Sequence, residues 1–322
     1  MNPVVGRIFQ SPIHTDRTSL FPTADSNTPN DWKNERLTLF LETQLPQYDI
    51  LLLQETWTPA SGGRKERLMR TAYEQGYHYY ARSACAGRLV DAMLLILSRH
   101  PLTSFSEWTY SNSMGDEKKA TKGVMHARAL LHGKSTCRLD LFTTHLQSGG
   151  GDSGGNAVRS LQTKELATFV RQVSGTGDIV SVIGGDFNIQ GRQRNGRYNV
   201  LERELVEGMD LVDQRARREL QNVMYPPYRN VHSFENVSDV LPVTSPNRLD
   251  ASASKLTGLD PEKGSTLDYV FFVKEGGHGE NQVRLVKNAS RVEQMLVQNE
   301  EFVSLSDHFG ISLEVVCDAV EE

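Results

Sequence analysis

The sequence predicts an α/β or α+β fold in which two packed β-sheets are flanked by helices. Apolar, β-branched runs typical of buried strands alternate along the chain with amphipathic segments typical of helices. The chain has 322 residues, which is enough to bury a sizeable core in one large domain or two small ones. No repeat of the length used by solenoid proteins is present.

The composition predicts a soluble globular protein, with 38% hydrophobic and 23% charged residues. No apolar run is long enough to span a membrane, and the N-terminus lacks a positive region followed by an apolar stretch. The three cysteines, Cys85, Cys137 and Cys317, lie far apart in the sequence and show no metal-ligand spacing. This sparse, odd count does not indicate a disulfide framework, so we expect a reducing, cytoplasmic location.

The net charge argues mildly against bulk affinity for nucleic-acid phosphates. It is −5 at neutral pH, whereas nucleic-acid-binding domains normally carry a basic excess. A local basic groove would not show in this count.

The N-terminal region, residues 1–29, is rich in Ser, Thr, Pro and Asn. Its one apolar patch, Val4–Phe9, predicts an extension or a single edge strand followed by a loop. Asn30 is a candidate N-cap for the first helix, which Pro46 would end. We therefore expect one catalytic domain over residues 30–322.

The remaining elements follow in order. The apolar runs predict strands at Tyr48–Glu55, Val90–Leu97, Leu139–His145, Asp178–Asn188, Thr266–Val273 and Phe309–Val316. Helical spacing predicts helices at Arg64–Gln75, Asn156–Val173 and Tyr198–Glu207, the first and last ended by Gly76 and Gly208. Residues 215–263 show little periodicity and are predicted to form a long, irregular surface excursion.

The chain is organised around the strand that ends in Gly184-Gly-Asp186-Phe-Asn188. Two glycines allow a sharp turn, and if the strand continues, Asp186 and Asn188 point to the same face. A carboxylate and a carboxamide would then lie together at the mouth of a sheet, where ligands usually bind. A plain tight turn explains the same residues equally well when they are considered alone.

Five apolar runs adjoin such polar groups: Glu55, His145, Asp186 with Asn188, Asp268, and Asp307 with His308. Each group has an ordinary explanation as a strand cap, a turn or a satisfied histidine, except that a carboxylate inside an aromatic strand, as at Asp268, requires a partner. The fivefold recurrence favours a shared site.

Carboxylates and histidines at strand ends can form a divalent-metal and acid–base site. Mg²⁺ is typically held by one or two carboxylates together with water and substrate phosphate, so Glu55 and an aspartate would suffice. Phosphodiester hydrolysis also needs an activated water and protonation of the leaving group. Asp186, His145 and a second histidine could fill these roles.

The motifs resemble those of the metal-dependent endonuclease/exonuclease/phosphatase superfamily, whose members share a DNase I-like four-layered α/β sandwich. The matching stretches run in the family order: Leu53-Gln-Glu55, Thr144-His145-Leu146, Gly184-Gly-Asp186-Phe-Asn188, Leu267-Asp268-Tyr269 and Ser306-Asp307-His308. The resemblance spans about residues 31–316.

The resemblance implies a role for each of these side chains. Glu55 would bind Mg²⁺, with Mn²⁺ as an alternative, and Asp307 would lie nearby. Asp186 would orient or deprotonate the attacking water, and Asn188 would hold a phosphoryl oxygen. His145 would stabilise the phosphoryl group, and His308 would be the acid–base histidine oriented by Asp268.

One position departs from the family pattern. The first strand of the family carries an asparagine that helps to organise the metal, and the corresponding candidate here is Gln10, after Val4–Phe9. Gln10 could substitute for the asparagine with one more methylene, or the usual strand could be absent.

The branch that the chain resembles most is the neutral sphingomyelinases. In the segment Asp116-Glu-Lys-Lys-Ala-Thr-Lys122-Gly123 an aspartate precedes a Lys-Gly pair, and Arg159 with Gln162 is also similar to that branch. Lys122 and Arg159 would then bind the phosphate of a membrane phospholipid headgroup, and peripheral membrane contact is expected.

Two other classes remain open. Thr266-Leu-Asp268-Tyr resembles some deadenylases, so a nuclease or deadenylase is the alternative enzyme. A catalytically inactive scaffold is favoured by the missing asparagine and opposed by the intact Glu55, His145, Asp186, Asp268 and His308 set.

Overall fold

The computed structural model of the chain describes most of the sequence, with gaps between the described segments. These are residues 4–13, 32–56, 63–84, 91, 93–132, 136–149, 154–174, 180–191, 196–209, 218–222, 224, 243–248, 259–275, 283–298 and 302–317. The candidate N-cap Asn30 and the predicted strand start Asp178 lie outside them.

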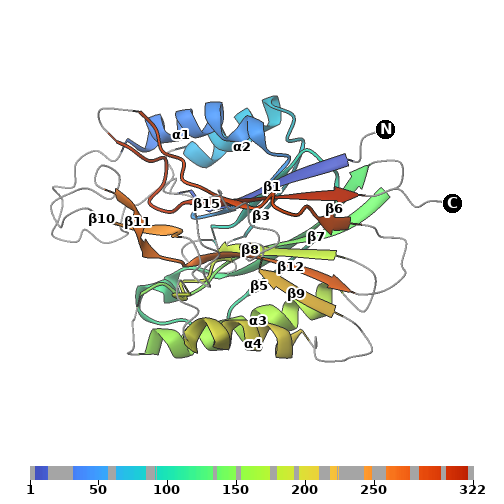
Figure 1. Cartoon of the computed structure of the whole chain (residues 1–322), viewed down its shortest axis with the longest axis vertical. Coiled ribbons are helices and arrows are strands. Elements are labelled where there is room, and N and C mark those ends of the chain that lie inside the picture. Colours follow the sequence, from blue (N-terminus) through green and yellow to red (C-terminus); the bar gives the residue numbers. More distant parts are fainter. Residues whose placement is uncertain are drawn as a thin grey trace.

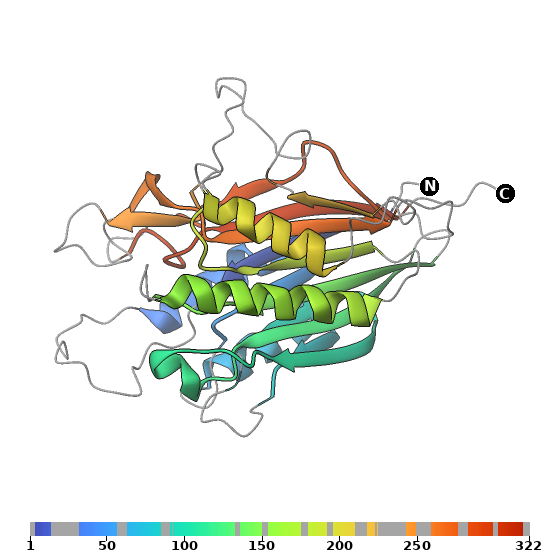
Figure 2. The same cartoon turned by 90° about the horizontal axis from the view of Figure 1, so that it is seen from below.

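The described residues form two mixed β-sheets packed face to face, with a helical layer on each outer face, as the sequence predicts (Figures 1 and 2). In the seven-stranded sheet the order is β13 (Val283–Leu285), β15 (Gly310–Cys317), β1 (Val4–Pro12), β2 (Ile50–Gln54), β4 (Leu95–Ser98) and β3 (Tyr79–Arg82), and β14 (Arg291–Glu293) also pairs with β15. In the six-stranded sheet the order is β5 (Leu102–Thr109), β6 (Gly123–His132), β7 (Thr136–His145), β8 (Val180–Asp186), β12 (Asp268–Glu275) and β9 (Arg218–Asn222).

Helices α1 (Lys33–Thr43) and α2 (Arg64–Glu74) lie against the seven-stranded sheet, and α3 (Asn156–Ser174) and α4 (Gly196–Gly208) lie against the six-stranded sheet (Figure 1). Two short 3₁₀ helices, η1 (Leu45–Gln47) and η2 (Gly115–Lys119), lie in connections. A separate pair of strands, β10 (Ser245–Arg248) and β11 (Leu259–Ser265), extends from one end of the sandwich (Figure 1).

The apolar run of β2 is buried on both faces of its sheet. Ile50 and Leu52 belong to the core between the two sheets, whereas Leu51 and Leu53 belong to the core under α1 and α2. Side chains alternate along a strand, so a continuous apolar run is what a strand covered on both faces requires. Each buried leucine contributes about 1.5–3 kcal/mol through the hydrophobic effect.

The expectation of an N-terminal extension or edge strand is wrong at β1. The strand lies inside the sheet, parallel to β2 on one side and antiparallel to β15 on the other. Its Ile8 faces the other sheet and its Phe9 faces the helices, both fully buried. The chain needed the distant C-terminal strand β15 to cover this edge, which no local pattern reveals.

The predicted helices are present, with small shifts at their ends. The helix α1 begins at Lys33 after Trp32 and ends before η1, which contains Pro46. Gly76 follows α2 with a φ of 93°, the left-handed conformation that ends helices, and α3 and α4 extend one or two residues beyond the predicted ranges.

The prediction of one irregular excursion at residues 215–263 is wrong in part. It contains β9, which extends the six-stranded sheet, and the β10 and β11 pair. The strands β3 and β5 were also not predicted, because they are sheet edges whose side chains are mostly exposed and polar or aromatic rather than uniformly apolar.

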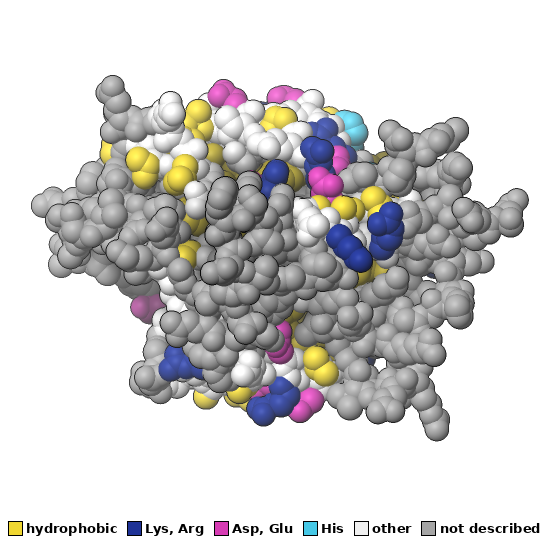
Figure 3. All heavy atoms as spheres, in the orientation of Figure 1, with side chains coloured by type: hydrophobic (Ala, Val, Ile, Leu, Met, Phe, Trp, Pro, Cys, Tyr) yellow, Lys and Arg dark blue, Asp and Glu magenta, His cyan; other side chains and the backbone are white. Residues whose placement is uncertain are grey.

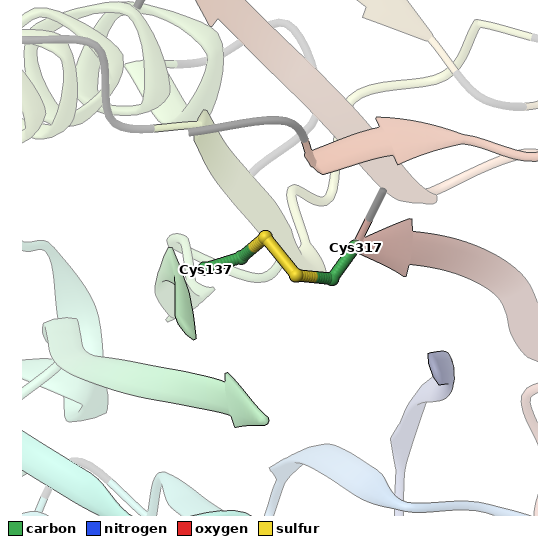
Figure 4. Close-up of a disulfide and its surroundings, with 2 residues drawn as sticks. All are labelled: Cys137 and Cys317. Atoms are coloured by element: carbon green, nitrogen blue, oxygen red, sulfur yellow. A yellow bond between two sulfur atoms is a disulfide. The ribbon is translucent and has the colours of Figure 1, made fainter. Parts of the chain in front are cut away.

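The expectation of reduced, unpaired cysteines is wrong for two of the three. Cys137, near the start of β7, and Cys317, at the end of β15, form a disulfide that joins the two sheets (Figure 4). The pairing closes a span of 180 residues, a separation that gives no local spacing signal. Cys85 lies outside the described residues.

Among the described residues, no helix combines the length and the apolar character needed to cross a membrane.

Candidate active site

Three neighbouring strands bring the predicted catalytic groups to one end of the six-stranded sheet. The register of parallel β7 and β8 pairs His145 with Asp186, and the register of antiparallel β8 and β12 pairs Asp186 with Asp268. All three residues are buried. His308, just before β15, completes the group from the other sheet. The site therefore lies at the shared end of both sheets.

Asp268 and His308 form a hydrogen-bonded pair across the two sheets. His308 Nδ1 lies 2.9 Å from Asp268 Oδ2. Burial opposes the charge on His308, but the negative charges of Asp268, Asp186 and Asp307 outweigh it and raise the pKa of His308 well above its usual value. The imidazole is therefore protonated at neutral pH and is held in one orientation by Asp268.

The carboxyl group of Asp186 has a pKa shifted upward to near neutrality. Its burial, together with the negative charge of Asp268, raises the pKa of Asp186 to about 7, and the positive charges of His308 and Lys122 oppose this shift. A carboxylate with a pKa near the working pH is well suited to accept and release protons.

Gly184 and Gly185, the two glycines before Asp186, do not serve to form the sharp turn that the sequence predicted. They lie inside β8. A Cβ at Gly185 would approach the carbonyl oxygen of Thr144 to 2.1 Å, and one at Gly184 would contact Gln10 and Leu52 of the other sheet at 3.1 Å. The glycines therefore allow close packing of β8 between β7 and the opposite sheet.

The prediction that the strand continues to Asn188 is wrong, because β8 ends at Asp186. Asn188 adopts a left-handed conformation with a φ of 53°, and its N–H donates to Asp186 Oδ1 at 2.8 Å. Its side-chain Nδ2 lies 3.3 Å from the carbonyl oxygen of Leu146. The turn and the functional interpretation are thus both compatible with the geometry, since the turn brings the Asn188 carboxamide beside the end of β7.

Lys122 is buried beside His145, within the group of predicted catalytic residues. Its Nζ is 3.1 Å from His145 Nε2 and donates to the Leu146 carbonyl oxygen at 2.8 Å, and the residue is 3% exposed. Its acidic partner is Glu117, with Nζ 2.8 Å from Oε1, whereas Asp116 pairs with Lys119. The sequence pointed to Asp116, and Glu117 was missed because neighbouring acidic residues cannot be told apart by pattern.

Arg159 has a supporting position. Its Nη1 donates to the carbonyl oxygens of Gln147 and Gly149, at 2.9 Å each, and its Nη2 donates to Asn156 Oδ1. These contacts hold the loop that follows His145. A direct contact of Arg159 with a substrate would require the guanidinium to leave these partners.

Glu55 and Asp307 have the donor chemistry of a magnesium site. Both are partly buried, and carboxylate oxygens are the ligands that Mg²⁺ prefers. Glu55 follows β2 in a left-handed conformation, with a φ of 60°, which is uncommon for a non-glycine residue and typical of functional sites.

Gln10 lies in the layer between the sheets. Its Nε2 donates to Gln54 Oε1 at 2.7 Å, and Gln54 Nε2 in turn donates to Thr143 Oγ1 at 2.8 Å. The buried Oε1 of Gln10 receives no hydrogen bond from a described residue. Gln10 is thus linked to Gln54, the last residue of β2, which directly precedes Glu55.

A second arrangement could also hold a metal. One ligand atom each from Asp186, Asp268 and His308 lies within 4.8 Å of the others. However, Nδ1 of the charged imidazole of His308 donates its proton to Asp268, and a metal bound to this nitrogen would have to displace that proton. The geometry therefore favours an acid–base role for this trio.

Thr244 is a supporting residue that the sequence did not reveal. Its Oγ1 accepts hydrogen bonds from the N–H groups of Leu267 and Asp268, and its carbonyl oxygen accepts one from Phe309. It therefore holds the segments of Asp268 and His308 together. It lies in the region predicted to be an irregular excursion, which offered no periodic signal.

Comparison with known proteins identifies relatives of the whole arrangement. The family model described as Endonuclease/Exonuclease/phosphatase family matches residues 24–308. A sphingomyelinase of Dictyostelium discoideum is 24% identical in an alignment 332 residues long, gaps included, that covers 83% of this chain and 71% of that protein.

Solved structures share the fold at lower identity. Sphingomyelinase C from Streptomyces griseocarneus is 17% identical with a TM-score of 0.59, over 98% of this chain and 99% of that one. Beta toxin from Staphylococcus aureus with bound magnesium ions is 16% identical, with a TM-score of 0.59 over 97% and 99%. D. rerio TDP2 with a single-strand DNA product is 14% identical, with a TM-score of 0.58 over 97% and 98%. The predicted DNase I-like sandwich is confirmed.

Proposed function

The chain belongs to the endonuclease/exonuclease/phosphatase family, a family of phosphodiester hydrolases, and from this premise we propose that it is a Mg²⁺-dependent phosphodiesterase of the sphingomyelinase type. It would cleave sphingomyelin to ceramide and phosphocholine. The observation that carries the hydrolytic part is the convergence of His145, Asp186, Asp268 and His308 at one end of the sandwich.

The protonation states support a division of labour. Asp186, with a pKa of about 7, accepts the proton of the attacking water. His308 is protonated and held by Asp268, so it can donate a proton to the leaving oxygen. When the surroundings of a carboxylate and an imidazolium give the two groups different pKa values, one can act as the base and the other as the acid.

The negative charge on the phosphoryl oxygens would be stabilised by side-chain hydrogen-bond donors and by the metal ion. Lys122 and His145 lie together beside Asp186, and Asn188 presents a carboxamide from the following turn. Glu55 and Asp307 would hold Mg²⁺, and the ion would supply Lewis-acid stabilisation of the phosphoryl group. The bound magnesium in the similar beta toxin supports this choice of ion.

The lipid substrate rests on two observations. Lys122 of the Lys-Gly pair reaches His145, as a residue that binds a headgroup phosphate would. The Dictyostelium relative is a sphingomyelinase. We propose Lys122 as a substrate-binding residue and Arg159 as the residue that holds the adjacent loop.

A nuclease is the second candidate, because the similar TDP2 structure contains single-strand DNA. The net charge of −5 weighs against it. On the face drawn in Figure 3, described lysines and arginines lie beside acidic and hydrophobic side chains rather than in one continuous basic surface. An inactive scaffold is disfavoured by the intact acid–base trio.

Because the proposed substrate is a membrane lipid, we propose that the protein meets it at a membrane surface. The Cys137–Cys317 disulfide favours an oxidising compartment over the cytoplasm that the cysteine count suggested.

Hydrolysis of sphingomyelin micelles tests the proposal. The purified chain would be assayed with Mg²⁺ and with a chelator, beside single-stranded DNA and RNA. We expect metal-dependent release of phosphocholine and no cleavage of nucleic acid. Cleavage of nucleic acid alone would support the assigned active site but show that the substrate is a nucleic acid. No turnover of sphingomyelin, DNA or RNA would favour an inactive scaffold.

A further inference from the structure

A fully buried ion pair is connected through the backbone to Glu55, a candidate metal ligand, and takes no part in the chemistry described above. Lys65 Nζ, from the first turn of α2, is 3.1 Å from Asp91 Oδ2, and the two side chains are only 2% and 4% exposed. Two charges removed from water in this way are costly, and a pair of this kind adds less stability than well-packed apolar residues could. Its position therefore calls for an explanation other than stability.

The second carboxylate oxygen of Asp91 holds a strained piece of backbone. Asp91 Oδ1 accepts a hydrogen bond from the N–H of Met93 at 3.0 Å. Met93 is a buried, unbranched residue in the left-handed region, with a φ of 58°. Non-glycine residues adopt this conformation only where their surroundings impose it.

The carbonyl oxygen of Met93 in turn holds the residue that follows Glu55. It accepts hydrogen bonds from both the N–H and the Oγ1 of Thr56, at 3.0 Å each, and Thr56 is fully buried. Glu55, one residue earlier, has a left-handed φ of 60°. Two strained residues, Met93 and Glu55, are thus coupled through Thr56.

Met93 also contacts the segment that leads to Lys122. Its side chain and that of Ala120 form a small buried cluster, two residues before Lys122. Met93 therefore contacts the candidate metal-binding side of the site through its carbonyl oxygen and the segment before Lys122 through its side chain.

From this chain of contacts we propose that Lys65 and Asp91 are positioning residues for Glu55. The ion pair fixes Met93, Met93 fixes Thr56, and Thr56 keeps the backbone of Glu55 in the conformation that presents its carboxylate to Mg²⁺. The inference rests on the proposed function only in assigning Glu55 to the metal. Groups outside the direct ligands commonly tune metal affinity by about 10- to 100-fold.

Substitution at the pair tests the proposal through metal binding rather than activity alone. In Lys65→Met we expect the Mg²⁺ dissociation constant, measured by calorimetry, to rise about tenfold, the lower end of that range. The amide of Thr56 should exchange hydrogen faster, with Mg²⁺ absent, because its acceptor Met93 is no longer held.

The double variant Lys65→Met with Asp91→Asn provides the rescue. The carboxamide that replaces the Asp91 carboxylate keeps an oxygen that can accept from the N–H of Met93, and no charge is left buried without its partner. We expect the dissociation constant to return to within about threefold of the wild-type value. This variant also serves if Lys65→Met does not fold.

A matched control separates positioning from general stability. Arg128→Met breaks another ion pair to a buried aspartate, Asp140, on β6 and β7. We expect a lower melting temperature for this control with unchanged Mg²⁺ affinity and unchanged Thr56 exchange. The proposal is overturned if Lys65→Met behaves like the control, with a dissociation constant within twofold of wild type.

The failure of the proposed function would look different. Binding of Mg²⁺ without release of phosphocholine would remove the sphingomyelin assignment and leave the positioning inference standing. Wild-type affinity for Mg²⁺ in Glu55→Gln would show that Glu55 is not a ligand and would overturn the inference. Absence of Mg²⁺ binding by the wild type would overturn both.

Discussion

At the scale of single residues, Asp186 and His308 are the two groups to which we assign the proton transfers of the proposed reaction. Their environments give the two groups different protonation behaviour. Burial raises the pKa of Asp186 to about 7, whereas the acidic neighbours of His308 raise its pKa and keep the imidazole charged. Asp268 connects the two, because its charge raises the pKa of both groups.

His308→Ala and Asp186→Asn should each reduce the turnover number by about 10²- to 10⁴-fold, the usual contribution of a general acid or base. Circular dichroism should show that both variants remain folded. His78→Ala, which changes an exposed histidine, is the control and should keep full activity. Wild-type turnover in either site variant would refute the mechanism.

The activity should rise with pH and level off above about pH 7, because Asp186 must lose its proton to act as the base and its pKa is about 7. A pH profile of the turnover number at saturating Mg²⁺ measures this limb. A profile without a rising limb near pH 7 would assign the base to another group.

The same shift predicts a cost in stability. Asp186 binds its proton more tightly in the folded state than in the unfolded chain, so stability falls as the pH rises from about 4 to 7. The loss is about 1.4 kcal/mol for each unit by which the pKa is raised. Asp186→Asn removes the charge and should therefore melt at a higher temperature than the wild type at pH 8. Thermal melts should show the difference disappearing near pH 4.

At the scale of elements, the position of β8 between β7 and the opposite sheet depends on its glycines. Gly185→Ala should destabilise the fold by about 3 kcal/mol or more, since the added methyl would meet the backbone carbonyl of Thr144 at 2.1 Å. Gly6→Ala on β1 is the matched control, because its new methyl would meet only the side chain of Val315 closely, at 3.2 Å. Urea unfolding compares the two, and equal losses would contradict the packing argument.

The loop and strand from η2 to β6 deliver Lys122 to the site. Charge-assisted hydrogen bonds contribute about 1.5–3 kcal/mol, so Lys122→Ala should lower kcat/KM for sphingomyelin by about ten- to a hundredfold. Lys118, three residues after Gly115 on η2, is exposed and Lys118→Ala should leave kcat/KM unchanged. Equal effects of the two substitutions would remove Lys122 from the substrate argument.

At the scale of the whole molecule, the Cys137–Cys317 disulfide joins the two sheets far from the site. Cys137 lies eight residues before His145 on β7, or roughly 26 Å along an extended strand. Thiol titration of the unfolded protein should detect one free cysteine before reduction and three after it. Cys137→Ser should lower the free energy of unfolding by about 2–5 kcal/mol while sphingomyelin hydrolysis at low temperature is retained. Three free thiols before reduction would contradict the disulfide.

Much of the fold was determined by the sequence itself. The runs of β2, β7, β8, β12 and β15 are apolar enough to require burial, and the polar residues at their ends mark the site edge. Local periodicity also placed helices α1 to α4, because an amphipathic stripe and a stop glycine or proline are encoded within or beside most of these segments.

Only the tertiary structure decided which residues meet. The place of β1 inside its sheet depends on β15, some three hundred residues later, and the Cys137–Cys317 pair spans 180 residues. Glu117 rather than Asp116 meets Lys122, and Thr244 meets Asp268, through loops that carry no periodic signal. The physical reason is common to all four cases: periodicity reports which side of an element is buried, whereas a partner is selected by the packing of segments that are distant in the chain.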